Sequence, residues 1–307
     1  MKILLEDCQL SNVYLRYQYL LERSDKYDII VSINKLSTEI LNKYKRILLV
    51  ERMDSAGIGV KVRKVLDHPH IINCLKMYCM ADRENHNKPT VSSRLFLNSL
   101  YPKAETFADD IIVSEKGFKK IINGFNFFHY DKFTELFMTI KKCDIKPTAE
   151  RGIDLFYAGT VEYKTKFGIN KYITNHRSKC VENIIKIGLR ERFNVKAYSG
   201  RKFSYADYIR KMLDTKVILS PFGWGEYCHR DYEALLCGCI LIKPKFLKVM
   251  QTPNIDEHVI QWANFNDFSD IDYNSIMAIC QDKQPYARNE LCQAKYAEAN
   301  IIKDILK

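Results

Sequence analysis

The sequence predicts an α/β fold of two consecutive units, each with a parallel sheet covered by helices. Two observations in the 307-residue chain carry this prediction. Short apolar runs typical of buried strands alternate with helical patterns in both halves. Between the halves, residues 141–152 ("KKCDIKPTAERG") are charged and turn-forming, as expected of a linker. We therefore expect one domain over residues 1–147 and a second over residues 148–307.

The N-terminal half opens with three strand patterns separated by two helical ones. Apolar runs predict strands at 2–7, 28–33 and 46–52. The pattern at 11–24 has helical spacing behind a serine N-cap, and 35–43 is the second expected helix. Strands alternating with helices in this way favour a parallel sheet with both faces covered.

Further apolar runs at 70–78, 94–101 and 109–115 add strands to this half, and the polar segment 80–93 predicts a loop. Residues 57–64, "GIGVKVRK", contain two close glycines. They lack both the third glycine of a dinucleotide-binding loop and an obvious helix cap, so we expect a flexible turn.

The C-terminal half repeats the alternation. The expected strands are 153–161, 193–200, 217–223, 239–244 and 258–265, and the expected helices are 171–191, 204–215 and 230–238. A helix-rich segment, 285–307, ends the chain and is free to return to the first domain. The result is two Rossmann-like units, and ligands of such sheets bind beyond the carboxyl ends of the strands.

The formal net charge of +11 is spread over both halves without an arginine-rich arm. A nucleic-acid-binding protein usually clusters its positive charge in a stripe, so we expect no nucleic-acid partner. The charge favours a polyanionic or diphosphate ligand, or peripheral contact with an anionic membrane surface. A solvated lysine-rich surface explains it equally well.

Ten cysteines occur without a C-x-x-C pair, which indicates thiols in a reducing compartment. The first residues carry acidic groups within their apolar run, unlike a signal peptide. No apolar stretch approaches the roughly 18 residues needed to span a bilayer. We therefore expect a cytoplasmic protein.

Metal-ligating patterns are weak. His68 and His70 flank a proline and favour a structural turn, because a metal would need further ligands. Asp270 and Asp272 in "DFSDIDY" indicate the polar start of a helix.

Residues 219–244, "LSPFGWGEYCHRDYEALLCGCILIKP", place large and charged groups between two apolar runs. Ser220, Gly223 and Gly225 allow the backbone to approach a ligand, and the following helix offers its N-terminal N–H groups. From this helix, Arg230 can pair with a phosphate, and Glu233 can accept hydrogen bonds from two sugar hydroxyls.

The alternative for this stretch is a capped helix in which acidic residues, Asp231 and Glu233, simply complement the helix dipole. Both interpretations fit the residues alone.

The same segment resembles the donor-site segment of GT-B nucleotide-sugar glycosyltransferases, in particular the exostosin-like and bacterial capsule or lipopolysaccharide types. In those enzymes a Gly-rich turn runs into R-D-x-E-A-x-x-x-G, which here spans Arg230 to Gly238. The resemblance implies that Glu233 holds the nucleotide ribose. A weaker likeness over residues 153–177 makes Arg177 a candidate diphosphate cation, and "ERMDS" at 51–55 faintly resembles the acceptor-domain counterpart.

The resemblance implies an enzyme that transfers a sugar from a nucleotide-diphosphate donor to a glycan, glycoprotein or lipid-linked acceptor. It also implies a donor site in the C-terminal domain, no bound metal and no cofactor besides the nucleotide sugar. The residues expected to bind the donor are Gly159, Thr160, Arg177, Ser220, Gly223, Trp224, Gly225, Glu226, Arg230, Asp231, Tyr232 and Glu233. A non-catalytic nucleotide- or glycan-binding protein with the same fold is the alternative.

Retaining relatives often pair two glutamates as E-x7-E. The first of these would fall on Gly225, and Glu226 is one position off, which favours an inverting reaction. Inversion needs a general base from the acceptor domain. Asp54 follows the strand 46–52 at its carboxyl end and is the expected base, although an aspartate that caps the loop would fit equally. Glu51 and Asp67 are the neighbouring alternatives.

Overall fold

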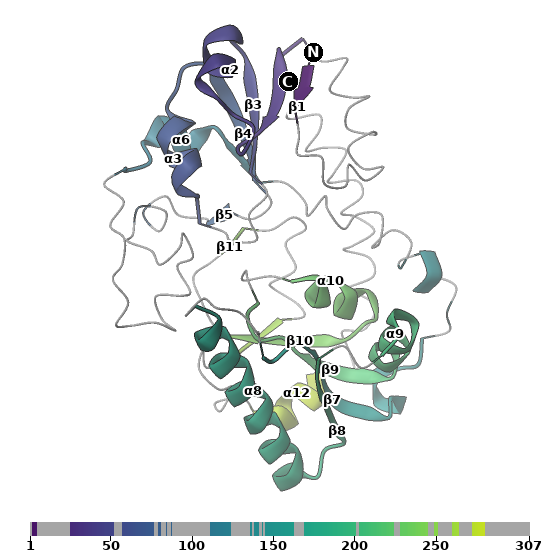
Figure 1. Cartoon of the computed structure of the whole chain (residues 1–307). Helices are drawn as coiled ribbons and strands as arrows, with labels where there is room; N and C mark the ends of the chain where they lie inside the picture. The colour runs from purple at the N-terminus through teal and green to yellow at the C-terminus, as the bar shows by residue number, and fades with distance from the viewer. Residues whose placement is uncertain are drawn as a thin grey trace. The chain divides into compact units, whose positions relative to one another are not determined.

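The computed structural model describes the following residues: 2–4, 25–51, 57–76, 79–80, 84, 87, 111–123, 136, 138–140, 143, 145–162, 169–200, 203–223, 228–244, 249–250, 260–263 and 272–279. The chain divides into two compact units. The first comprises residues 1–132, 248–253 and 293–307, and the second comprises residues 133–247 and 254–292. The described part of each unit is built on a five-stranded parallel sheet (Figure 1).

The sheet of the first unit runs in the order β1-β2-β3-β4-β6, with every neighbouring pair parallel. Its strands are β1 (Lys2–Leu4), β2 (Ile29–Ser32), β3 (Ile47–Glu51), β4 (Ile71–Lys76) and β6 (Ile121–Asn123). Its helices are α2 (Thr38–Lys43), α3 (Val60–Leu66) and α6 (Glu115–Lys119). A separate antiparallel pair joins β5 (Cys79–Met80) to β11 (Val249–Met250). Side chains of β2, β3 and β4 form one buried core cluster with α3.

Two expectations for the first unit are wrong. Residues 57–64 do not form a flexible turn, because α3 begins at Val60. The backbone N–H of Gly59 donates to the Glu51 carboxylate at 2.9 Å, so the cap of this helix comes from a strand eight residues earlier. The residues next to the start of this helix therefore do not indicate where it begins.

The second error concerns the strand expected at 109–115. Residues 111–114 are not in a strand, α6 starts at Glu115, and the strand beside β4 is β6 instead. The backbone of Val113 pairs with the side-chain amide of Asn87, and Ser114 caps α6 by accepting from the N–H of Gly117. These polar side chains satisfy backbone groups that a neighbouring strand would otherwise have to satisfy.

The sheet of the second unit runs β12-β10-β9-β7-β8, again with every pair parallel. Its strands are β7 (Ile153–Gly159), β8 (Val195–Ser199), β9 (Thr215–Leu219), β10 (Ile240–Pro244) and β12 (Ile260–Ala263). Its helices are α8 (Ile169–Glu191), α9 (Tyr205–Leu213), α10 (His229–Leu236) and α12 (Tyr273–Ile279), with a short 3-10 turn at Thr148–Glu150. The strand that follows β7 in the chain, β8, lies on one side of β7, and the next strand, β9, lies on the other. The strand order therefore reverses at β7, and ligands of such sheets bind at this switch point.

Helices cover both faces of this sheet (Figure 1). On one face, side chains of β7, β9 and β10 form a buried cluster with α8 and α12. Intervening strand residues such as Phe156 and Ile218 are also buried, and α9 and α10 contact the sheet. The period-two alternation of the strands thus supplies two apolar faces, as in other doubly wound sheets.

The expected linker, residues 141–152, lies entirely within the second unit. Arg151 is buried, and its guanidinium donates to the backbone carbonyls of Thr215, Cys237 and Gly238. Gly238 has a φ of +71° just after α10, a left-handed conformation that glycine adopts readily at the end of a helix.

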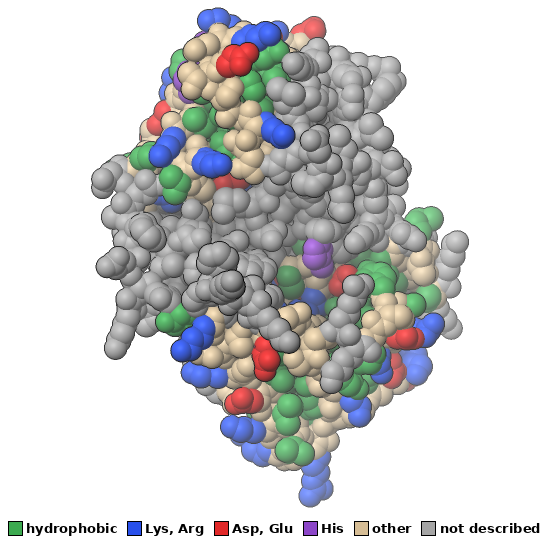
Figure 2. Space-filling model, in the orientation of Figure 1, with side chains coloured by type: hydrophobic (Ala, Val, Ile, Leu, Met, Phe, Trp, Pro, Cys, Tyr) green, Lys and Arg blue, Asp and Glu red, His purple; other side chains and the backbone are tan. Residues whose placement is uncertain are grey.

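Several sequence expectations fall outside the described residues: the helix at 11–24, the strand at 94–101 and the terminal helix at 285–307. Within the described chain, no disulfide is formed and no helix has the length and apolar character to cross a membrane. On the face shown in Figure 2, Lys and Arg side chains are scattered over the described parts of both units, with Asp and Glu side chains between them.

Candidate functional site

The second unit contains a pocket of about 290 Å³ at the carboxyl ends of β7 and β8. Its lining combines residues at and just after the ends of the two strands with an aromatic wall, the aromatic residues at and just before the start of α9. The lining residues are Ala158, Gly159, Thr160, Gly200, Phe203, Tyr205 and Tyr208.

Local sequence explains this shape. Gly200 follows β8 with a φ of +81°, and its N–H donates to the carbonyl of Gly159 at 3.0 Å, which ties the two strand ends together. Ser204 then caps α9 by accepting from the N–H of Asp207 at 3.1 Å. Because α9 starts immediately after this cap, Tyr205 and Tyr208 lie one turn apart on the same side of the helix.

Glu233 joins α10 to the aromatic wall. The hydroxyl of Tyr205 donates to Glu233 Oε1 at 3.1 Å, and Tyr208 lies near enough to the same carboxylate to influence its pKa. Burial raises the pKa of Glu233, while the two tyrosine hydroxyls and the nearby Arg230 counteract that rise. The carboxylate is therefore bonded to Tyr205, one of the residues that line the pocket.

Arg230, three residues before Glu233, lies against the end of β7. Its guanidinium lies 4.9 Å from the ring centroid of Tyr157 and next to the Cα of Gly159. Its Nε has no hydrogen-bond partner among the described residues, and its best carbonyl contact is Leu219 at 3.5 Å. Burial opposes the charge, but neighbouring Cys228, Tyr157, Tyr208 and Asp231 outweigh it and hold the pKa above its ordinary value. The site thus contains a buried cation with unused hydrogen-bonding capacity.

Asp231, between these two residues, has a different role. Its carboxylate accepts from the N–H of Cys228 at 2.9 Å, from the hydroxyl of Ser220, and from Lys243 at 2.8 Å. The Asp231–Lys243 ion pair is almost completely buried. Asp231 therefore caps α10 and anchors it to β10. The helix-capping interpretation covers both Asp231 and Glu233, and Glu233 instead contacts Tyr205 of α9.

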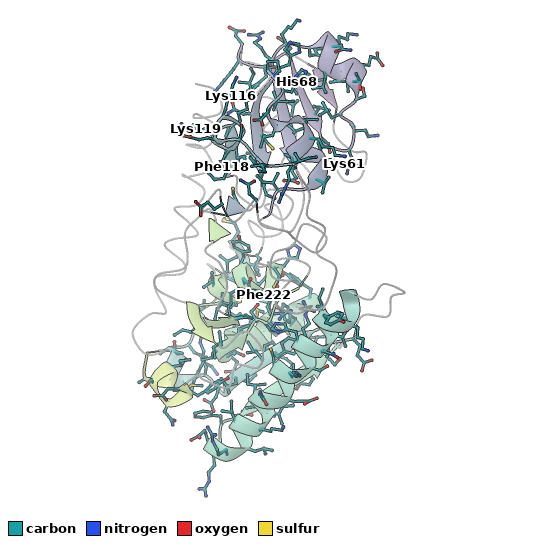
Figure 3. The ribbon with its side chains drawn as sticks, turned by 90° about the vertical axis from the view of Figure 1, so that its left-hand side faces the viewer. Lys61, His68, Lys116, Phe118, Lys119 and Phe222 are labelled. Atoms are coloured by element: carbon teal, nitrogen blue, oxygen red, sulfur yellow. The ribbon has the colours of Figure 1, made fainter. Side chains whose placement is uncertain are left out.

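The loop after β9 is held by side chains of α8. Arg177 donates through Nε to the carbonyl of Phe222 at 2.8 Å and through Nη1 to the carbonyl of Thr160. The N–H of Phe222, a residue labelled in Figure 3, donates to Nε2 of His176 at 3.3 Å. The strand expected over 217–223 ends at Leu219, because these side chains take up the backbone groups beyond it.

These contacts give Arg177 a structural position behind the pocket. It is buried, and its Nη2 would be 2.9 Å from a β-carbon at Gly223. Burial also lowers the pKa of His176 to about 3, with Arg177 and Lys243 adding to the shift. A neutral imidazole that accepts from the loop backbone fits this environment.

The structure brings together only part of the expected donor set. Gly159 and Thr160 line the pocket, and Arg230 and Glu233 border it, whereas Tyr232 is buried within the unit. Trp224, Gly225 and Glu226 lie outside the described residues. Phe203, Tyr205 and Tyr208 were missed, although the cluster "FSYADY" directly after a strand and a glycine is a signal that could have identified them.

The candidate bases of the first unit fall into different places. Asp54 lies outside the described residues. Glu51 is buried, forms an ion pair with Lys76 at 3.1 Å and accepts from Gly59. Asp67 is the C-cap of α3, before β4, and accepts from the hydroxyl of Ser114. It therefore lies at the amino end of the following strand, away from the carboxyl edge where ligands of such sheets bind.

The weak metal patterns have structural roles where they are described. His68 accepts from the N–H of His70 at 3.2 Å, and the two rings make an edge-to-face contact. Asp272 accepts from the N–H groups of Asn274 and Ser275 at the start of α12. Among the described residues no group of three or more His, Cys, Asp or Glu side chains is arranged to hold a metal ion.

The chain matches no protein-family model and no curated protein sequence significantly. Its fold is similar to a solved glycosyltransferase from Rickettsia africae, at 12% identity and a TM-score of 0.46 over 99% of this chain and 84% of that chain. It is also similar to Anabaena HepE in complex with UDP, at 12% identity and a TM-score of 0.43 over 99% and 98% of the two chains. An alpha-glucosyltransferase in complex with UDP and a 13-mer DNA follows, at 11% identity and a TM-score of 0.37 over 98% of each chain. Likenesses of this strength do not place the chain in a family.

Proposed function

We propose that the chain is a glycosyltransferase that binds a nucleotide-diphosphate sugar in the pocket of the second unit. The observation that carries this proposal is the pairing of Glu233 and Arg230 on α10, each of which contacts a residue that lines the pocket: Glu233 accepts from Tyr205, and Arg230 lies against Gly159. A flat base against aromatic rings, a diol on a carboxylate and phosphates near a guanidinium follow the order of groups in a nucleoside diphosphate. The pocket also lies at the carboxyl ends of parallel strands, where such ligands bind.

In this proposal the residues have separate tasks. The aromatic wall of Phe203, Tyr205 and Tyr208 packs against the base. Glu233 accepts hydrogen bonds from the ribose hydroxyls, and charge-assisted bonds of this kind are stronger than neutral ones. Arg230 stabilises the negative charge that develops on the departing diphosphate, and burial strengthens this interaction because water screens it less.

The roles that we propose on the acceptor side of the reaction are based on the sequence. We keep Asp54 as the proposed general base of an inverting transfer without a bound metal. Asp54 would take the proton of the acceptor hydroxyl as that oxygen attacks the anomeric carbon and the diphosphate leaves. A glycan, glycoprotein or lipid-linked hydroxyl is the proposed acceptor. Trp224, Gly225 and Glu226 precede α10 and are proposed to contact the donor sugar.

Slow donor hydrolysis tests the proposal without knowledge of the acceptor. Sugars linked to UDP, GDP, ADP and CDP would be incubated with the protein, and release of the nucleoside diphosphate measured. We expect release from at least one donor, and a lower rate in Glu233→Gln than in Glu182→Gln, an exposed control on α8. Nucleotide binding without release or transfer would favour the non-catalytic alternative, and no binding at all would overturn the proposed pocket.

A further inference from the structure

The Glu233 carboxylate accepts a hydrogen bond from Tyr205 and has Tyr208 beside it, and these two tyrosines differ. Tyr205 is 47% exposed and is the first residue of α9, whereas Tyr208 is half-buried one turn later. The ring of Tyr208 lies 6.3 Å from that of Phe156, a buried residue of β7. Tyr208 is thus held by the core, while Tyr205 lies at the surface of the pocket.

This difference matters for any ligand that brings its own hydroxyl groups to Glu233. Tyr205 donates to Oε1, so a ligand diol that bridges the carboxylate competes with the Tyr205 hydroxyl for that oxygen. Exposed side chains move on picosecond to nanosecond timescales, and the Tyr205 hydroxyl can therefore move off Glu233 while its ring still lines the pocket. Tyr208 cannot leave as easily, because its ring packs against Phe156.

We infer that Tyr205 is a displaceable partner of Glu233: its hydroxyl occupies the hydrogen-bonding position of the ligand diol and is exchanged for that diol on binding. Tyr208, packed against Phe156, is the fixed neighbour of the carboxylate. The inference rests on the proposed function and adds a positioning role for two residues of the same site. One consequence is that Tyr205 lowers the affinity for the nucleotide, and its return to Glu233 promotes release of the diphosphate product.

The exchange predicts opposite effects for two conservative changes. Tyr205→Phe keeps the aromatic wall but removes the competing bond, so ribonucleotide affinity should rise by about 2- to 10-fold, the range of one net hydrogen bond. Tyr208→Phe removes the fixed hydroxyl beside the carboxylate and should lower that affinity. Tyr44→Phe, in the first unit, is the control for loss of a phenol hydroxyl and should change nothing.

The decisive measurement is calorimetric titration with UDP and with its 2′,3′-dideoxy analogue, with ADP, CDP and GDP pairs in parallel. A dideoxy ligand has no diol to exchange, so Tyr205→Phe should leave its affinity within about 2-fold of wild type, below the range of one hydrogen bond. Weaker ribonucleotide binding in Tyr205→Phe, or equal shifts for the ribo and dideoxy forms, would overturn the inference and leave Tyr205 as a wall residue. If the wild type binds no nucleoside diphosphate, the proposed function fails as well, so the two failures are distinguishable.

Discussion

The guanidinium of Arg230 fills the space that a side chain at Gly159 would need. A β-carbon at position 159 would lie 2.8 Å from Nη2 of Arg230 and 3.3 Å from the hydroxyl of Tyr157. Glycine is required here because the end of β7 and a buried cation approach each other closely. The same contact joins the pocket lining to α10, since Gly159 lines the pocket and Arg230 lies behind it.

Substitution of Gly159 by alanine should therefore act through Arg230. We expect Gly159→Ala to destabilise the protein by about 1–3 kcal/mol, the usual cost of overpacking, and to weaken nucleotide binding. In an Arg230→Gln background the stability cost should fall to less than half, because the clashing group is shorter. Chemical denaturation of the four proteins of this double-mutant cycle measures the coupling. Additive effects would show that Gly159 and Arg230 do not interact.

Asp231 and Glu233 should separate stability from binding. Asp231→Asn leaves Lys243 without a counter-charge in the core, so we expect a loss of about 3–5 kcal/mol in the free energy of unfolding. Glu115→Gln removes an exposed ion pair with Lys119 and should cost at most about 1 kcal/mol. An Asp231→Asn variant as stable as wild type but defective in nucleotide binding would instead put Asp231 in contact with the ligand.

His176 should make the protein less stable in mild acid. Its folded-state pKa of about 3 lies below the ordinary value of 6.5, so below pH 6.5 the unfolded chain binds a proton that the folded chain does not. The free energy of unfolding should fall as the pH is lowered from 6.5 to 5, by up to about 1.4 kcal/mol per pH unit from this group. His176→Gln keeps an acceptor for Phe222 and should flatten this slope, whereas His229→Gln, at an exposed position, should not. Equal slopes in wild type and His176→Gln would contradict the assignment.

Asp54 remains the proposed base, and kinetics can test it. Asp54→Asn should lower kcat for transfer by about 10²–10⁴-fold, the usual contribution of a general base. Donor affinity should be nearly unchanged, and donor hydrolysis should suffer less than transfer. Wild-type transfer rates in this variant, or a product that retains the donor's anomeric configuration, would remove Asp54 from this role.

The sequence predicts elements well where the deciding interactions are local. The helices α2 and α9, capped by Ser37 and Ser204, lie within the expected ranges 35–43 and 204–215, and apolar runs mark most of the described strands. The prediction of an element fails where its position depends on a residue that is not adjacent in the sequence. The start of α3 depends on Glu51, which lies on the preceding strand, and the backbone near Val113 depends on Asn87.

The candidate site shows the same division. Arg230, Asp231 and Glu233 are charged residues close together on one short helix. Their positions in the sequence do not separate their roles, but their surroundings differ. Asp231 faces Lys243 and Ser220, while Glu233 faces tyrosines of α9. These partners lie 11 to 28 residues away, so only the fold can separate the capping aspartate from the glutamate beside the pocket.

The most direct test of the central claim is calorimetric titration of the wild type, Glu233→Gln and Arg230→Gln with UDP, GDP, ADP and CDP and with the matching nucleosides. We expect the wild type to bind at least one nucleoside diphosphate. Glu233→Gln should weaken both diphosphate and nucleoside by about 1.5–3 kcal/mol, the worth of bonds to a charged group. Arg230→Gln should weaken the diphosphate alone. Wild-type affinity in both variants, or no binding of any diphosphate to the wild type, would contradict a nucleotide site in this pocket.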